Sequence, residues 1–243
     1  MSDAPGLEPL DESAFDSVLC VAAHPDDLEY GLAAAVDKWV RAGKTVTYLL
    51  ATRGEAGIET MAPAEAGPLR EQEERDGAAQ VGVDVVEFLD GFSDGVVEHG
   101  LALRRAIARE IRIRRPDLLV TLTYADSFPG GQVNQADHRA VGLAVLDAKA
   151  DAGNRWIFPE LVDEGHEPWQ ARQLFIAVDP QPSHVVDVSE HFDAAVASLS
   201  AHAAYLEALG PEYPSPTELL GNILGGQAER VGVSYAVTGR LVG

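Results

Sequence analysis

The chain has 243 residues, of which 46% are hydrophobic and 23% charged, a size and composition typical of one globular domain with a well-buried core. Its formal net charge of −21 at pH 7 argues against binding to nucleic acid or to an anionic membrane surface, because either partner requires positive potential. We therefore expect a single domain whose acidic surface mainly keeps it in solution.

The start of the chain does not resemble a secretory signal. Residues 1–16 are acidic and lack a basic start and an apolar stretch, and no apolar run reaches the roughly 18 residues of a membrane span. We expect residues 1–15 to be a flexible segment. Cys20 is the only cysteine and lies in an apolar run, so we expect a core thiol and no disulfide. Together these features predict a cytoplasmic protein.

The first part of the chain predicts a strand, a tight turn and a helix. Residues 17–23 form a short apolar run, residues 24–27 read His-Pro-Asp-Asp, and a helical pattern follows over 29–41. Pro25 holds His24 in an extended conformation, so the helix cannot begin before the carboxylates, and one of the two aspartates falls at the N-cap position. One imidazole and two carboxylates therefore leave the sheet together.

A histidine with a carboxylate three residues later is a pattern of zinc ligands. A catalytic zinc site takes three protein ligands and leaves one position for water, so His24 and Asp27 are candidate ligands and Asp26 is the candidate base. A lone pattern of this kind is more often a helix cap beside an exposed histidine. Its position after a buried strand favours a site, because ligands of open α/β sheets bind outside the carboxyl ends of the strands.

Strands and helices then alternate. We expect a buried strand over 45–51, a functional or mobile loop over 52–68, a charged helix over 69–81 and a strand over 85–89. No G-x-G-x-x-G follows the first strand, so a dinucleotide-binding site lacks its phosphate fingerprint. An amphipathic helix over 101–114 carries basic residues at helical spacing, which is most simply a solvated face.

A second polar turn follows the fourth predicted strand, 117–122. A glycine-bearing loop over 123–136 ends in Asp137 and His138, at the start of a helix over 137–151. His138 therefore lies after a strand and at a helix N-terminus, like the histidine of the first turn. If the two strands are neighbours, the ligands of both turns can converge on one ion. Asp137 would then orient His138 or another ligand through a hydrogen bond, or only cap the helix.

The last third of the chain completes an α/β pattern. We expect an irregular stretch over 152–169, strands over 174–178 and 184–188, a helix over 189–209 capped by Ser189, a helix over 217–229 and a strand over 232–237. Three of its histidines, His184, His191 and His202, lack metal-type spacing and are more simply structural. The whole pattern predicts a Rossmann-like, three-layer α/β/α domain with a mostly parallel sheet.

With both motifs in view, the chain resembles the LmbE-like, PIG-L family of zinc-dependent de-N-acetylases. The first motif, Ala-His-Pro-Asp-Asp with an acidic residue and a glycine after it, covers 23–31, and the second covers 137–142. Lesser similarities lie at 52–57, 70–83, 89–95, 115–117 and 186–202. The resemblance implies one LmbE-like domain over 1–243, and a hydrolase that removes an N-acetyl group from an N-acetylglucosamine-type glycoconjugate.

The resemblance also implies roles for individual residues. It places Zn²⁺, or another divalent metal, on His24, Asp27 and His138, with Asp26 as general base. It places Arg53, Glu55, Arg70 and Asp94 near the sugar. The expected partner is a small amino-sugar glycoconjugate, and a homo-oligomer is possible because family members are often multimeric.

One position departs from the family pattern. The family usually has a second histidine three residues before the last ligand, where this chain has Gln135. Glutamine can donate a hydrogen bond to an oxyanion but cannot carry a proton. A non-catalytic paralogue that binds a sugar or metal therefore stays open beside the deacetylase. An amidase acting on thiol-sugar conjugates also stays open, because the sequence does not separate it from a deacetylase.

Overall fold

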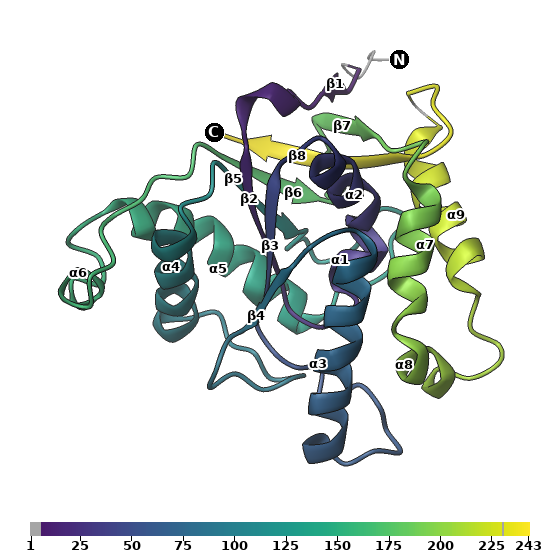
Figure 1. Cartoon of the computed structure of the whole chain (residues 1–243), viewed down its shortest axis with the longest axis horizontal. Helices are drawn as coiled ribbons and strands as arrows, with labels where there is room; N and C mark the ends of the chain where they lie inside the picture. Colours follow the sequence, from purple (N-terminus) through teal and green to yellow (C-terminus); the bar gives the residue numbers. More distant parts are fainter. Residues whose placement is uncertain (1–5, 230) are drawn as a thin grey trace.

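One mostly parallel sheet forms the centre of the computed structural model, which describes residues 6–229 and 231–243 (Figure 1). In this part of the chain eight strands follow the order β1-β7-β8-β6-β5-β2-β3-β4. They are β1 (Glu8–Pro9), β2 (Ser17–Ala22), β3 (Thr45–Leu50), β4 (Val85–Phe88), β5 (Leu118–Leu122), β6 (Gln173–Ala177), β7 (His184–Asp187) and β8 (Ala236–Val242).

The pairing of the strands decides where the two polar turns lie. β2 pairs in parallel with β3 on one side and with β5 on the other, and β5 pairs in parallel with β6. β8 runs antiparallel between β6 and β7. Because β2 and β5 are parallel neighbours, their carboxyl ends lie side by side at one edge of the sheet. This confirms the adjacency that a shared site requires.

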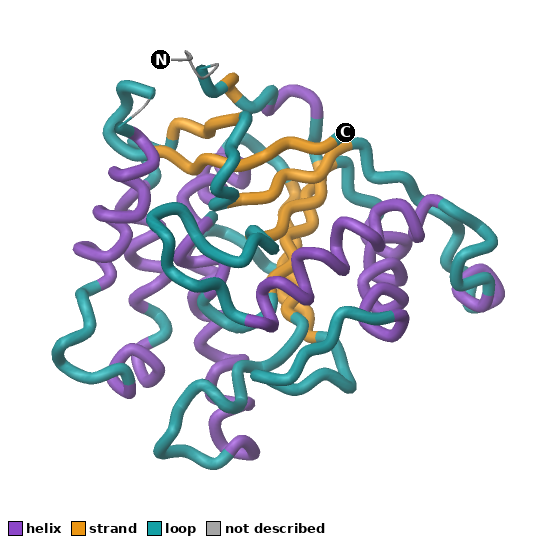
Figure 2. Tube along the Cα trace, turned by 180° about the vertical axis from the view of Figure 1, so that it is seen from behind, coloured by secondary structure: helices purple, strands orange, loops and turns teal. Residues whose placement is uncertain are grey.

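Helices cover both faces of the sheet, so the domain has three layers (Figures 1 and 2). α4 and α5 lie on one face, and α2, α3, α7 and α9 lie on the other. The helices are α1 (Asp27–Gly31), α2 (Ala33–Arg41), α3 (Pro63–Gln80), α4 (Leu101–Arg114), α5 (Ala136–Gly153), α6 (Glu160–Asp163), α7 (Phe192–Ser200), α8 (Ala203–Ala208) and α9 (Pro216–Ala228), with a 3₁₀ turn η1 (Glu12–Ala14). Among the described residues, no helix combines the length and apolar character needed to cross a bilayer.

β2 is buried on both faces, which makes it a rigid base for the turn that follows. Leu19 and Val21 pack into the core beneath α4 and α5, while Val18, Cys20 and Ala22 pack into the core on the opposite face. This alternation follows from the two-residue period of a strand. It explains why the segment reads as a continuous apolar run in the sequence.

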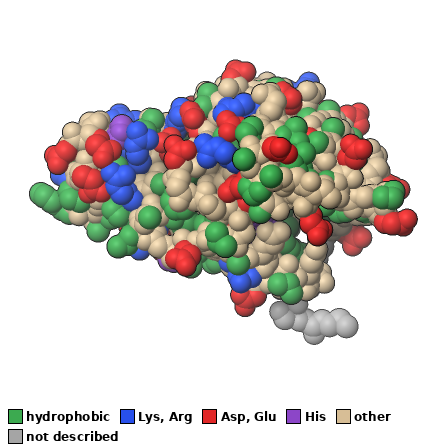
Figure 3. Space-filling model, turned by 90° about the horizontal axis from the view of Figure 1, so that it is seen from below, with side chains coloured by type: hydrophobic (Ala, Val, Ile, Leu, Met, Phe, Trp, Pro, Cys, Tyr) green, Lys and Arg blue, Asp and Glu red, His purple; other side chains and the backbone are tan. Residues whose placement is uncertain are grey.

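Charged side chains of both signs interleave on the surface. Figure 3 shows Lys and Arg side chains among Asp and Glu at the end of the molecule formed by α4 and α6. There Arg105 of α4 pairs with Glu160 of α6 at 2.6 Å. The prediction of a solvated basic face is wrong for Arg112, which is 1% exposed and donates hydrogen bonds to the backbone oxygens of Ala152 and Asn154.

Two helices of the first half differ from the predictions. The predicted helix over 29–41 is two helices, α1 and α2, because Leu32 leaves the helical conformation with a φ of −143°. The break allows Gly31 to lie close to Leu122 of β5, where an added Cβ would come to 3.0 Å. α3 begins at Pro63, not at residue 69, because proline fits the first turn of a helix. The predicted loop over 52–68 is shorter for this reason.

The predicted helix over 189–209 is also two helices. α7 ends at Ser200 and α8 begins at Ala203, with His202 at the junction, where its side chain is fully buried. Ser189 does not cap α7, because its hydroxyl donates a 2.7 Å hydrogen bond to Asp187 Oδ1 instead. The burial of a polar ring at the junction accompanies a bend that the alanine-rich sequence does not indicate.

The two ends of the described chain are corrected as well. Residues 8–15 do not behave as a free segment: β1 pairs with β7, and Leu10 and Phe15 are buried. Residues 1–5 of the predicted flexible segment lie outside the described residues. The last strand covers 236–242, not 232–237, because it pairs with both β6 and β7 despite its polar middle.

Candidate metal centre

The turn after β2 is closed by one of its own carboxylates. Asp27 Oδ2 accepts hydrogen bonds from the backbone N–H groups of Ala23 at 3.0 Å and His24 at 2.9 Å. Asp26 occupies the N-cap position of α1, as predicted, but its side chain makes no capping hydrogen bond. Its φ of 90° is left-handed, a conformation that costs a non-glycine residue about 1–3 kcal/mol. The turn therefore stores strain at the candidate base.

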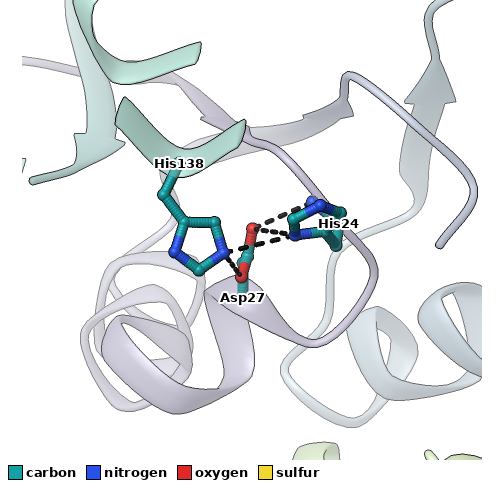
Figure 4. Close-up of side chains that lie close together, drawn as sticks. All are labelled: His24, Asp27 and His138. Carbon is teal, nitrogen blue, oxygen red and sulfur yellow. Dashed lines mark hydrogen bonds and ion pairs between the residues drawn. The ribbon is translucent and has the colours of Figure 1, made fainter. Parts of the chain in front are cut away.

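The two polar turns bring two imidazoles and a carboxylate together (Figure 4). His24 Nδ1 lies 3.2 Å from His138 Nε2 and 3.6 Å from Asp27 Oδ2. His138 Nε2 lies 3.0 Å from Asp27 Oδ1. The three side chains, called the metal triad below, can each offer one ligand atom within 4.8 Å of the others. The structure thus brings together the three ligands predicted from the sequence.

Hydrogen bonds on the far side of each ring fix which nitrogen faces the centre. His24 Nε2 lies 3.2 Å from Asp137 Oδ2 and 3.0 Å from Asp94 Oδ1, and His138 Nδ1 lies 2.9 Å from Asn134 Oδ1. An N–H on each of these outer nitrogens leaves His24 Nδ1 and His138 Nε2 as acceptors toward the centre. Such outer partners are typical of metal-binding histidines.

Asp137 is therefore an orienting residue for His24. Of the two roles considered for it, capping is wrong, because its carboxylate accepts from the backbone of Gly95 at 2.7 Å and of Val97 at 3.1 Å and makes no cap on α5. It is 2% exposed and tied to a neighbouring loop at two points. Its orientation, and hence that of the His24 ring, is fixed by the fold.

Protonation of the metal triad depends on the same contacts. Burial opposes a charge on His24, but hydrogen bonds from its ring to the carboxylates of Asp137, Asp27 and Asp94 outweigh it and hold the pKa of His24 well above its usual range. Burial likewise opposes the charge on His138, and Asp27 raises its pKa. Asp27 is buried, yet His138 and His24 hold its pKa well below the usual range. A cation would take the place of the protons on the two imidazoles.

Asp26 lies beside the metal triad with a different set of neighbours. Burial raises the pKa of Asp26 to about 7, opposed mainly by the guanidinium of Arg70, whose Nη2 lies 3.0 Å from Asp26 Oδ2. Arg70 also donates to the backbone oxygen of Pro25 and stacks over Tyr205, 3.7 Å from the ring centroid. The N–H of Asp26 donates to Glu74 Oε2 at 3.0 Å. These contacts hold the strained residue in place.

A cavity of about 1090 Å³ opens over the metal triad. Of the four residues that the resemblance places near the sugar, Arg70 and Asp94 line it, and so does Gln135. Arg53 and Glu55 do not line it: Arg53 pairs with Glu71 at 3.1 Å, and Glu55 accepts from the backbone N–H of Arg53. These two residues shape the loop between β3 and α3.

The sequence predictions missed two groups of residues. Asn134 stands four residues before His138, a helix-like spacing that could have marked it as the partner of that ring. Glu29, Glu74 and His202 form a buried polar cluster behind Asp26. Burial raises the pKa of Glu29 to about 8 and lowers the pKa of His202 to about 3. These three come from distant segments, so no local spacing indicates the cluster.

Comparisons with known proteins identify a family and relatives that match this chain. The model of one family, PIG-L, described as GlcNAc-PI de-N-acetylase, matches residues 19–149, which contain the whole metal triad. Diacetylchitobiose deacetylase of Thermococcus kodakarensis is 27% identical over 187 residues, covering 76% of this chain and 68% of that protein.

A second relative acts on an inositol conjugate by its name. The 1D-myo-inositol 2-acetamido-2-deoxy-alpha-D-glucopyranoside deacetylase of a Nocardioides species is 27% identical, covering 86% of this chain and 89% of that protein. Among solved structures, N,N′-diacetylchitobiose deacetylase of Pyrococcus horikoshii superposes with a TM-score of 0.84 at 21% identity, covering 95% of this chain and 85% of that one. This last likeness confirms the fold.

Proposed function

Since the chain belongs to the PIG-L family, whose model matches more than half of it, we propose that it is a metal-dependent hydrolase that removes an N-acetyl group from an N-acetylglucosamine-type glycoconjugate. The observation that carries the proposal is the convergence of His24, Asp27 and His138 at an open cavity that Asp26 also lines. The names of two relatives, both deacetylases of acetamido sugars, support the substrate class.

The donor set of the metal triad fits a divalent cation, and we propose zinc. Two imidazole nitrogens and a carboxylate oxygen are ligands that catalytic zinc sites use, and their remaining positions are already hydrogen-bonded to Asp137, Asp94 and Asn134. A zinc ion held there would supply a Lewis acid that polarises the amide carbonyl and acidifies water.

Asp26 is the residue that we propose to move protons. Its carboxylate lies in the cavity wall, and a pKa near 7 suits a group that must first accept a proton from water and later return it to the departing amine. Arg70, paired with Asp26, keeps the carboxylate aimed and limits how far burial raises its pKa. Asp26 makes both proton transfers, because the side-chain amide of Gln135 can neither accept nor release a proton.

We propose that Gln135 helps to stabilise the negative charge that develops on the carbonyl oxygen. It stands at the N-cap of α5, three residues before His138, and lines the cavity. Its amide can donate a hydrogen bond to an oxyanion, as side-chain amides do in other hydrolases. A histidine at this position could both stabilise the oxyanion and donate a proton to the amine, and glutamine can do only the first.

Acetate release is the direct test of the function. Zinc-loaded protein is incubated with N,N′-diacetylchitobiose, with GlcNAc-inositol and with a panel of other GlcNAc conjugates, and both acetate and free amine are measured. We expect equal amounts of the two products from at least one compound. Metal binding without turnover across the panel would favour the sugar-binding paralogue, and turnover confined to thiol-sugar conjugates would favour the amidase.

We further propose that the enzyme works in the cytoplasm. Cys20 is buried and unpaired, which suits a reducing compartment. Cell fractionation of the native host, followed by detection of the chain, tests this location.

A further inference from the structure

A second group of potential metal ligands lies behind Asp26. Glu29 comes from α1, Glu74 from α3, and His202 from the junction of α7 and α8. Each is at most 1% exposed, and one ligand atom from each lies within 4.8 Å of the others. None of these residues belongs to the metal triad or lines the cavity.

The cluster has unused ligand atoms. Both ring nitrogens of His202, Oε2 of Glu29 and Oε1 of Glu74 are buried without a hydrogen-bond partner. Within residues 6–229 and 231–243, no Lys or Arg side chain forms an ion pair with Glu29 or Glu74. Buried polar atoms normally have partners, because an unpaired one costs about 1–3 kcal/mol. Four such atoms on three neighbouring side chains therefore indicate a missing partner.

The spacing of the atoms identifies the kind of partner. His202 Nε2 lies 3.7 Å from Glu29 Oε2 and 3.8 Å from Glu74 Oε2, the oxygen of Glu74 that also accepts the Asp26 N–H. These distances are too long for direct hydrogen bonds, which end at about 3.2 Å. Two ligands that each lie about 2.1 Å from a tetrahedral ion are about 3.4 Å apart. The metal triad has ligand separations of 3.0 to 3.6 Å, so the two groups have similar dimensions.

We propose that Glu29, Glu74 and His202 form a second, buried site for a divalent transition-metal ion. Two carboxylates and a neutral imidazole suit zinc and its first-row neighbours, and the imidazole disfavours calcium and magnesium. The ion joins α1, α3 and the α7–α8 junction, and it supports the strained turn through the hydrogen bond between Asp26 N–H and Glu74.

Gly77 provides the room for this arrangement. A Cβ at position 77 would come to 3.1 Å from His202 Nε2 and 3.4 Å from Glu29 Oε1. Ser198 Oγ lies 3.2 Å from Glu29 Oε1 and donates to the backbone oxygen of Gly77 at 2.8 Å. Oε1 of Glu29 therefore lies against Ser198, while Oε2 lies 3.7 Å from His202 Nε2.

Anomalous diffraction from crystals of the whole zinc-loaded protein tests the site without any mutation. Data collected above and below the zinc absorption edge should show two peaks, one within the metal triad and one among Glu29, Glu74 and His202. A single peak at the metal triad, with water or nothing in the cluster, would overturn the proposal.

Metal counting on variants gives a second test. Zinc per folded chain, measured by mass spectrometry after dialysis, should be about two equivalents in the parent and one in Glu29→Gln, which keeps the shape of the side chain. His138→Ala should also fall to one, and the one that remains should lie in the cluster. His184→Gln, which removes a histidine of β7, is the control and should keep two.

The outcome does not depend on the enzyme's activity. If no substrate is turned over but two equivalents bind, the second site stands and the proposed function falls. If protein that holds only one equivalent of zinc releases acetate, the proposed function stands and the second site falls. Glu29→Gln protein that folds by circular dichroism and still binds two equivalents would contradict the site.

Discussion

Asp26 combines a left-handed backbone with a buried carboxylate. A φ of 90° is unfavourable for aspartate, and the residue keeps it because Glu74 accepts its N–H and Arg70 pairs with its side chain. Residues held in this way cluster at functional sites. The conformation turns the carboxylate away from the capping position and into the cavity, next to the metal triad.

Asp26→Asn should separate metal binding from catalysis. The amide keeps the size of the side chain but cannot accept a proton, so we expect kcat to fall by about 10²–10⁴-fold while zinc at the metal triad is retained. Steady-state acetate release and metal content of the same sample measure the two effects. Asp90→Asn, at a 92% exposed side chain, is the matched control. Unchanged kcat in Asp26→Asn would refute the assignment of the base.

Asp137→Asn should weaken metal binding without removing a ligand. The amide cannot offer the same carboxylate charge to the N–H of His24 Nε2, so zinc affinity at the metal triad should fall by about 10–100-fold. Competition with a fluorescent chelator measures the affinity, with His138→Ala as the reference for complete loss. An affinity equal to the parent's would mean that Asp94 alone fixes the ring.

Gln135→His tests whether the missing acid limits the rate. A histidine at this position of the cavity wall can donate a proton to the amine, so we expect kcat to rise and its pH profile to gain a descending limb on the alkaline side. The pH dependence of kcat measures this. A variant with lower kcat and no new limb would show that the hydrogen bond from glutamine matters more than a proton.

Individual helices and strands were predictable to different degrees. The apolar runs of β2, β3 and β5 and the regular pattern of α4 gave nearly the observed bounds, since one period dominates each segment. The break between α7 and α8 was not predictable, because it depends on the burial of His202 beside two carboxylates of other helices. Ligands at strand ends leave a local signal, whereas a cluster built from three distant segments leaves none.

The same distinction applies to the site. His24, Asp27 and His138 were found because each follows a buried strand. Arg53 and Glu55 were expected near the sugar but hold a loop, since neighbours far along the chain such as Glu71 decide where a long side chain points. Local spacing therefore predicts which side chains at strand ends lie together better than it predicts which side chains line the cavity.

Arg112 ties α4 to the segment after α5, and Arg112→Met should destabilise the fold. The substitution removes the donor from two buried backbone oxygens at the end of α5 and from two part-buried ones after it, so the free energy of unfolding should fall by about 2–4 kcal/mol. Urea unfolding followed by circular dichroism measures the change. Arg109→Met, at a more exposed ion pair of the same helix, should change stability by less than about 1 kcal/mol. An equal loss of unfolding free energy in both variants would show that the hydrogen bonds of Arg112 add no more stability than the exposed ion pair does.

At the scale of the whole molecule, zinc should stabilise the protein more at high pH than at low pH. Without metal, the raised pKa values of His24 and His138 mean that the folded state holds their protons more tightly than the unfolded chain does. That stability is fully present below their unfolded pKa near 6.5 and is lost as the pH rises through the folded values. Zinc must displace these protons, so its affinity should rise by about tenfold per pH unit for each proton released.

Thermal unfolding with and without zinc, at pH 6 and at pH 8, measures this linkage. We expect the rise in Tm on adding zinc to be several degrees larger at pH 8, because stabilisation grows with ligand concentration relative to Kd. His138→Ala should lose most of the difference. A rise of the same size at both pH values would mean that the imidazoles are already neutral in the metal-free protein.

The position of β8 has a consequence for how the chain folds as it is synthesised. β1 and β7 connect to the rest of the sheet only through β8. In the sequence β8 comes after β7, with the helices α7, α8 and α9 between them. The block from β2 to β6, with its two ligand-bearing turns, has all its internal pairings once residue 177 has left the ribosome. β1 and β7 can join the sheet only after residues 236–242 have been synthesised. A nascent chain released before that point would have the metal triad assembled but would lack the pairing of β1, β7 and β8 with the rest of the sheet.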